Sequence, residues 1–137
     1  MINIKELRIG NLVSSSLKIT NIVYKVSGLD LKDSFNGLDG VITIVKNEGI
    51  SNPVTVWCQC LEPIPLTPEL LEKCGFEYDN GRECWGMDRE CIDINISPKE
   101  IGIEVDCWEN SLIKCNYLHQ LQNMHYAITG KELEVKL

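Results

Sequence analysis

The chain has 137 residues, of which 44% are hydrophobic and 24% are charged, and its formal net charge is −7. This length fits one domain or two very small ones, the apolar content excludes a disordered chain, and no apolar run approaches the ~20 residues of a membrane-spanning helix. The N-terminus lacks the basic and then apolar regions of a signal peptide, so we expect a cytoplasmic protein with no membrane contact.

The net charge is concentrated in residues 76–109, which hold ten acidic residues against three basic ones. The rest of the chain holds equal numbers of both signs. A surface that contacts the phosphates of a nucleic acid needs positive charge. The distribution therefore argues against direct nucleic-acid binding through this segment, and it bears on partners more than on the fold.

Seven cysteines lie between residues 58 and 115, and no two have the Cys-x-x-Cys spacing of common zinc sites. We expect them to be reduced, mostly buried thiols, and we expect no cofactor. The alternative is a metal site that combines Cys58 and Cys60 with His119 or His125. The full set is Cys58, Cys60, Cys74, Cys84, Cys91, Cys107 and Cys115.

Residues 1–62 have the pattern of short β-strands rich in β-branched residues and separated by Gly, Asn and Asp turns. The expected strands are 12–13, 18–29, 41–45 and 54–58. Such a series predicts a small barrel or a curled sheet. Residues 7–13 resemble the opening of SH3-like barrels, in which a glycine and a polar residue precede the first strand.

A short helix should follow the proline-rich connector 61–66. Thr67 is the expected N-cap and Pro68 takes the first helical position. Gly75 should end the helix in the C′ position. Leucines and a cysteine between them form the expected packing face.

Residues 76–115 predict an antiparallel meander. Asn80 and Gly81 form a hairpin turn, and strands should follow at 91–96, 101–107 and 111–115. Five alternating isoleucines should lie in the core, namely Ile92, Ile94, Ile96, Ile101 and Ile103. The same alternation places Asp93, Glu104 and Asp106 on the opposite face, which should be acidic.

Three interpretations of this acidic face remain open. It is a solvated surface that keeps the protein from sticking, or it binds a partner by imitating the charge of a nucleic acid, or it holds calcium. The calcium interpretation lacks an Asp-x-Asp-x-Asp-Gly loop.

The last expected element is an amphipathic helix over residues 117–128, capped by Asn116. Gln120, Gln122 and Asn123 fall on its polar side, and the two histidines are expected at its surface or boundary. Residues 132–136 could add an edge strand. The whole is an α+β protein in a single domain over 1–137, with possible subdomains 1–62 and 63–137. No catalytic motif is present, so we expect a protein that is not an enzyme.

Three blocks of the sequence, residues 5–13, 61–76 and 117–133, resemble a family of small proteins carried by phages and mobile elements of Bacteroidota. The resemblance brings no catalytic residue with it. It implies an accessory protein that works inside the bacterial host. The principal hypothesis is a non-enzymatic protein that binds and inhibits a host defence protein, with Asp93, Glu104 and Asp106 in the contact surface.

Two alternatives stay open. The first is a sponge that sequesters a nucleotide-derived signal molecule, because cations and aromatic rings hold phosphates and bases. The second is a structural accessory protein of the virion. The residues available to a sponge, besides Arg8, are Arg82, Arg89, Trp57, Trp85 and Trp108.

Overall fold

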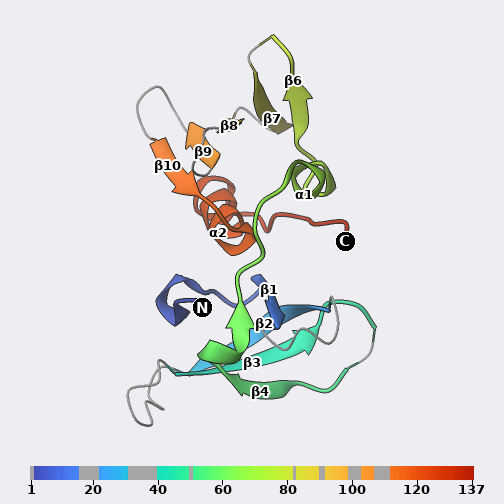
Figure 1. Ribbon diagram of the computed structural model, residues 1–137, viewed down its shortest axis with the longest axis vertical. Helices are drawn as coiled ribbons and strands as arrows, with labels where there is room; N and C mark the ends of the chain where they lie inside the picture. Colours follow the sequence, from blue (N-terminus) through green and yellow to red (C-terminus); the bar gives the residue numbers. More distant parts are fainter. Residues whose placement is uncertain are drawn as a thin grey trace. The chain divides into compact units, whose positions relative to one another are not determined.

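The computed structural model describes residues 2–15, 22–30, 40–49, 51–81, 83–89, 92–98, 103–106 and 112–137. The side chains at 84, 88, 89, 92–98, 103–106 and 112–114 are not described. Within these ranges the protein is α+β and rich in strands, as the sequence predicts (Figure 1). The chain divides into two compact units, which are described separately below: unit 1 is Met1–Ile64 with Leu118–Asn123, and unit 2 is Pro65–Tyr117 with Met124–Leu137.

Unit 1 contains a five-stranded antiparallel sheet with the strand order β4-β3-β2-β1-β5 (Figure 1). Its elements are η1 (Ile4–Glu6), β1 (Leu12–Ser15), β2 (Val23–Asp30), β3 (Val41–Lys46), β4 (Val54–Trp57), the 3-10 turn η2 (Cys58–Cys60) and β5 (Leu61–Glu62). In the described residues β4 and β5 remain the two edges of the sheet. The curled sheet is therefore the correct alternative, and the closed barrel is not formed.

A β-bulge interrupts the pairing of β2 with β3 between Val26 and Gly28. A Cβ atom on Gly28 would lie 3.3 Å from both Cβ and Oγ1 of Thr43, its cross-strand partner. Glycine thus permits the close approach of the two strands, and the bulge raises the local twist that curls the sheet.

One face of this sheet, the inner face, carries the core of unit 1. Val13, Val26 and Ile42 are completely buried there. The N-terminal segment and η2 cover them, and together they form one apolar cluster with Ile44 and Leu61. The covering residues are Ile2, Ile4, Leu7 and Cys58.

The first turns of α2 (Leu118–Thr129) belong to unit 1 and bind its N-terminal segment through polar side chains. Oε1 of Gln122 accepts a hydrogen bond of 2.9 Å from the backbone N–H of Leu12, and Gln122 is buried. The expectation that Gln122 lies on a solvated face is therefore wrong. The amphipathic pattern misplaced it because a buried backbone donor, rather than water, satisfies the amide.

Unit 2 begins with the bridge between Pro65 and Tyr117 and continues into α1 (Pro68–Lys73). Oγ1 of Thr67 accepts a hydrogen bond from the backbone N–H of Leu70, which is the N-cap contact that the sequence predicts. Gly75 follows the helix with a φ of 85°, in the left-handed region that glycine adopts most easily.

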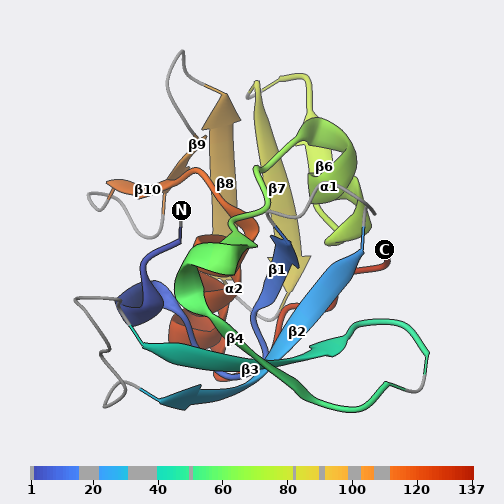
Figure 2. The ribbon, with the colours of Figure 1, turned by 60° about the horizontal axis from the view of Figure 1, so that its bottom comes forward.

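The sheet of unit 2 has the antiparallel order β10-β9-β8-β7-β6. Its strands are β6 (Glu77–Asp79), β7 (Cys84–Arg89), β8 (Ile92–Pro98), β9 (Ile103–Asp106) and β10 (Leu112–Cys115), and Figure 2 shows β7 and β8 as neighbours. Asp79 pairs with Cys84, so a four-residue loop joins β6 to β7 in place of the expected two-residue turn. Glu83 adopts a φ of 52° in this loop.

The register separates the two faces of this sheet. Ile94 pairs with Met87 and Ile96 pairs with Trp85, and both Met87 and Trp85 are buried. Directly paired residues lie on the same face of a sheet. The isoleucine positions of β8 therefore share the buried face, as alternation predicts, although the exposure of their side chains lies outside the described part. Ile101 lies outside the described residues.

The C-terminal tail after α2 forms no strand, which corrects the expectation for residues 132–136. Its backbone is held by a hydrogen bond of 2.9 Å from the N–H of Lys136 to the carbonyl oxygen of Lys73. Leu133 is buried and fixes the tail by its side chain. Charged and apolar residues do alternate over 132–137, so the local pattern fits a strand, but the backbone of Lys136 bonds to the end of α1 instead of to a strand.

Candidate functional site

The antiparallel register gathers acidic residues on one face of the unit 2 sheet. Alternate residues of a strand lie on one face, and so do residues that pair directly across two strands. Asp88 pairs with Asp93, and Glu104 and Asp106 pair with Ser97 and Asn95 of the same strand. The acidic positions of this face come from four strands: Glu77, Asp79, Asp88, Asp93, Glu104 and Asp106.

We call these six positions the acidic face. It lies opposite the face that carries the buried Trp85 and Met87. Lys114, which pairs with Glu104, is the basic residue that the described strands place on the same side. The alternation within single strands does not place Glu77, Asp79 and Asp88 on this face, because their position depends on how β6, β7 and β8 pair. Glu77 and Asp79 are exposed.

Both histidines of the chain are buried in hydrogen-bond networks of α2, which corrects the expectation that they lie at its surface or boundary. Nε2 of His119 lies 3.4 Å from Oε2 of Glu6. Burial lowers the pKa of His119, and the hydrogen bond and charge of Glu6 act in the opposite direction. Nδ1 of His125 lies 3.0 Å from the carbonyl oxygen of Lys131 and 3.4 Å from Oγ1 of Thr129. These contacts account for the burial of the two imidazoles by a structural role.

The side chains of four of the seven cysteines are described, and these four are thiols rather than disulfides. Sγ of Cys58 donates a hydrogen bond of 2.9 Å to the carbonyl oxygen of Ile2. Burial raises the pKa of Cys74 to about 12, so its thiol stays protonated. Cys60 is half-buried. Within the described ranges, no three His, Cys, Asp or Glu side chains form a group that could hold a metal ion.

The residues expected to bind a nucleotide are divided between the two units. Trp57 lies on β4 of unit 1 and is 37% exposed, whereas Trp85 lies on β7 of unit 2 and is only 8% exposed. The ring of Trp85 packs against Tyr78, with centroids 5.3 Å apart and planes at 60°. Nε of Arg8 donates to Asn123. Arg82, Trp108 and the side chain of Arg89 lie outside the described part.

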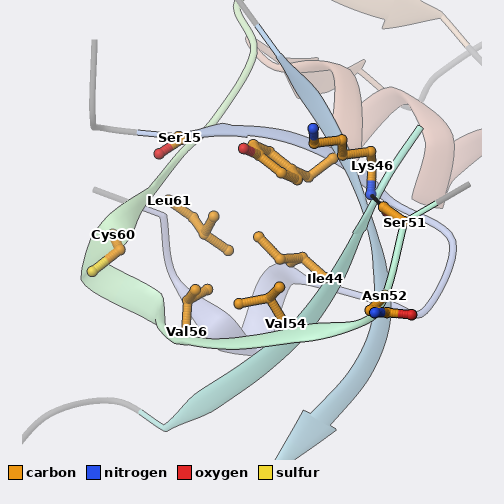
Figure 3. Close-up of a pocket in the computed structure, with 10 residues that line it drawn as sticks. Ser15, Ile44, Lys46, Ser51, Asn52, Val54, Val56, Cys60 and Leu61 are labelled. Atoms are coloured by element: carbon orange, nitrogen blue, oxygen red, sulfur yellow. Dashed lines mark hydrogen bonds between the residues drawn. The ribbon is translucent and has the colours of Figure 1, made fainter. Parts of the chain in front are cut away.

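A pocket of about 280 Å³ lies on the inner face of the unit 1 sheet, where the core cluster ends (Figure 3). The strand pairs Tyr24–Lys46, Ile44–Val54 and Ser15–Leu61 place these residues on one face. The sequence pattern does not predict this pocket, because it depends on the curl of the sheet. Its lining residues are Ser15, Tyr24, Ile44, Lys46, Ser51, Asn52, Val54, Val56, Cys60 and Leu61.

Comparison with known proteins identifies no family for this chain: no protein-family model, no curated protein and no solved structure matches it. None of the helices in the described ranges has the length and apolar character needed to cross a membrane. The geometry of the acidic face and of the pocket is therefore the basis for functional inference.

Proposed function

We propose that this chain is a non-enzymatic binding protein of a phage or mobile element. It docks through the acidic face on a protein of the host, in the principal hypothesis a defence protein, and inhibits that protein. The observation that carries this proposal is the register of the unit 2 sheet. It brings six acidic positions from four strands to one side, with Lys114 as the opposing charge. A concentration of one sign on a solvated face attracts a partner surface of the opposite sign.

The state of the histidines and of the buried thiols supports a binding role over a catalytic one. A histidine that acts as a general base must reach a substrate proton. His119 and His125 are instead buried, and their ring nitrogens contact Glu6 of η1 and the backbone carbonyl oxygen of Lys131. The thiol of Cys74 has a pKa of about 12, whereas a cysteine nucleophile requires a lowered pKa.

The test is a quantitative pull-down from lysate of the bacterial host, followed by measurement with the purified partner. The altered protein carries Asp93→Lys, Glu104→Lys and Asp106→Lys. We expect the wild type to retain a basic host protein that the triple variant loses. Association with the purified partner should slow as salt rises, because the screening length falls from about 10 Å at 0.1 M to about 3 Å at 1 M.

A matched control changes three acidic residues that lie off the acidic face: Glu48→Lys, Glu62→Lys and Glu134→Lys. All three are exposed, and both triple variants change the net charge equally. The control should keep the partner if position matters and lose it if only net charge matters. An unchanged partner profile for the variant of Asp93, Glu104 and Asp106 would falsify docking through this face.

A further inference from the structure

We propose that the pocket on the inner face of the unit 1 sheet binds a small amphipathic anion, which consists of an aliphatic body and a single carboxylate. This site is independent of the acidic face, because it is formed entirely by residues of unit 1. The proposal therefore stands or falls separately from the proposed function.

The floor of the pocket is apolar and comes from three strands. Ile44 of β3, Val54 and Val56 of β4 and Leu61 of β5 point toward a common centre in Figure 3. Ile44 and Leu61 also belong to the core cluster, so the floor continues the core outward. Val54 is 55% exposed, an unusual fraction for a valine whose strand partner Ile44 is buried. An aliphatic ligand would remove this surface from water.

The rim of the pocket is polar and holds the positive charge. Its residues include Lys46 and Ser51, and the backbone N–H of Lys46 donates a hydrogen bond of 2.9 Å to Oγ of Ser51. This bond fixes the rim next to the end of β3 (Figure 3). Among the described residues, no carboxylate forms an ion pair with the ammonium of Lys46, and none lines the pocket. Lys46 is the one charged residue among the described residues of the pocket lining, so this lining carries a single positive charge.

The size and the lining select the class of ligand. The volume of about 280 Å³ lies just below the range of about 300–1,000 Å³ that is typical of ligand pockets, so it suits a small ligand. A nucleotide carries several phosphate charges, and stacking of its base needs an aromatic platform. The lining provides one ammonium group and one aromatic ring, that of Tyr24. A ligand with one carboxylate on a short aliphatic chain matches one ammonium group and an apolar floor.

The experiment titrates the full-length protein with octanoate and follows the methyl signals of isoleucine, leucine and valine by NMR. Octylamine and octan-1-ol are the matched probes with a positive charge and with no charge. We expect saturable shifts confined to Ile44, Val54, Val56 and Leu61 with octanoate. Octan-1-ol should bind at least fivefold more weakly and octylamine should not bind, because a charge-assisted contact is stronger than a neutral one.

Two pairs of variants separate the site from its surroundings. Lys46→Met should weaken octanoate binding at least fivefold, and Lys25→Met should leave it unchanged. Lys25 lies on the same sheet but on the other face, since it is the neighbour of Tyr24 in β2. Val54→Asp should abolish binding by placing a negative charge at the floor. Thr55→Asp is its control on the opposite face of β4.

The integrity of each variant is checked by the methyl signals of the buried core residues Val13 and Ile42. Octanoate shifts that do not saturate, or that scatter over the chain, overturn the site. Equal binding of octanoate and octan-1-ol, or full binding by Lys46→Met, overturns the assignment of an anion. Alkylation provides a second readout: slower alkylation of Cys60 in the presence of octanoate, with no change at Cys74, would support the site.

Discussion

The imidazole of His119 contacts the carboxylate of Glu6 across 113 positions of sequence, with 3.4 Å between Nε2 and Oε2. His119 is 1% exposed, whereas Glu6 is exposed. Nδ2 of Asn123 strengthens the same junction by donating to the backbone carbonyl oxygen of Glu6 at 2.7 Å. The first turns of α2 are therefore attached to η1 by polar contacts, and these contacts can be tested.

The stability of the protein should fall as the pH drops below about 6.5. Burial lowers the pKa of His119 in the folded state, whereas an unfolded chain titrates near the ordinary histidine value of about 6.5. Below that pH the unfolded state takes up a proton that the folded state does not, so folding is disfavoured. Urea unfolding between pH 7.5 and 5.5 measures this loss.

His119→Gln isolates the contribution of this one histidine. Glutamine can still bond Glu6 but does not titrate, so the variant should lose less stability than the wild type over the same pH range. Identical losses in the two proteins would show that another group is responsible.

Gln122→Ala should reduce the free energy of unfolding by about 1–3 kcal/mol, because it leaves the buried N–H of Leu12 without its acceptor. Chemical denaturation measures the change. Gln59→Ala is the control, since Gln59 is exposed in η2, and it should change stability by less than about 0.5 kcal/mol. Equal effects of the two substitutions would argue against the hydrogen bond as the cause.

Thr67→Ala should destabilise the protein by about 1 kcal/mol, because the N–H of Leu70 loses its cap. Thr67→Ser keeps a hydroxyl at the same position and should retain most of the stability. The comparison uses the midpoints of thermal unfolding of both variants. A serine variant as weak as the alanine variant would assign the loss to the methyl group of Thr67 instead.

Alkylation of the native protein should label Cys60 before the other three cysteines whose side chains are described. Cys58, Cys74 and Cys115 are buried, and the thiol of Cys74, with a pKa of about 12, supplies almost no thiolate at pH 8. Peptide mapping by mass spectrometry after brief exposure to iodoacetamide measures the order. Denatured protein, in which the four thiols should react at similar rates, provides the reference.

Local patterns in the sequence were sufficient where one short segment decides the structure. The cap at Thr67, the glycine after α1 and the strand 41–45 all depend on neighbouring residues, and each is confirmed. The prediction of a two-residue hairpin turn at Asn80 and Gly81 is only partly confirmed, because the pairing of Asp79 with Cys84 makes the loop longer. Turn propensity identifies the bend but does not set the register.

Features that depend on distant segments were not predictable. Gln122 has the pattern of a solvated residue until Leu12, 110 positions away, presents its N–H. The pocket is lined by residues from strands β1 to β5, so it forms only when these strands have paired into the curled sheet. The acidic face combines residues that a local pattern predicts with residues that depend on strand pairing. Alternation along single strands found Asp93, Glu104 and Asp106, whereas Asp88 needs the pairing of β7 with β8.

Unit 1 is discontinuous in the chain, because residues 118–123 complete it. A ribosome that has released the first 64 residues has supplied the whole first sheet but not the acceptor for Leu12 or the partner of Glu6. Vectorial synthesis usually lets N-terminal domains mature first. Here the N-terminal sheet must wait until residues 118–123 have been translated, so its final contacts form only after most of unit 2 has been synthesised.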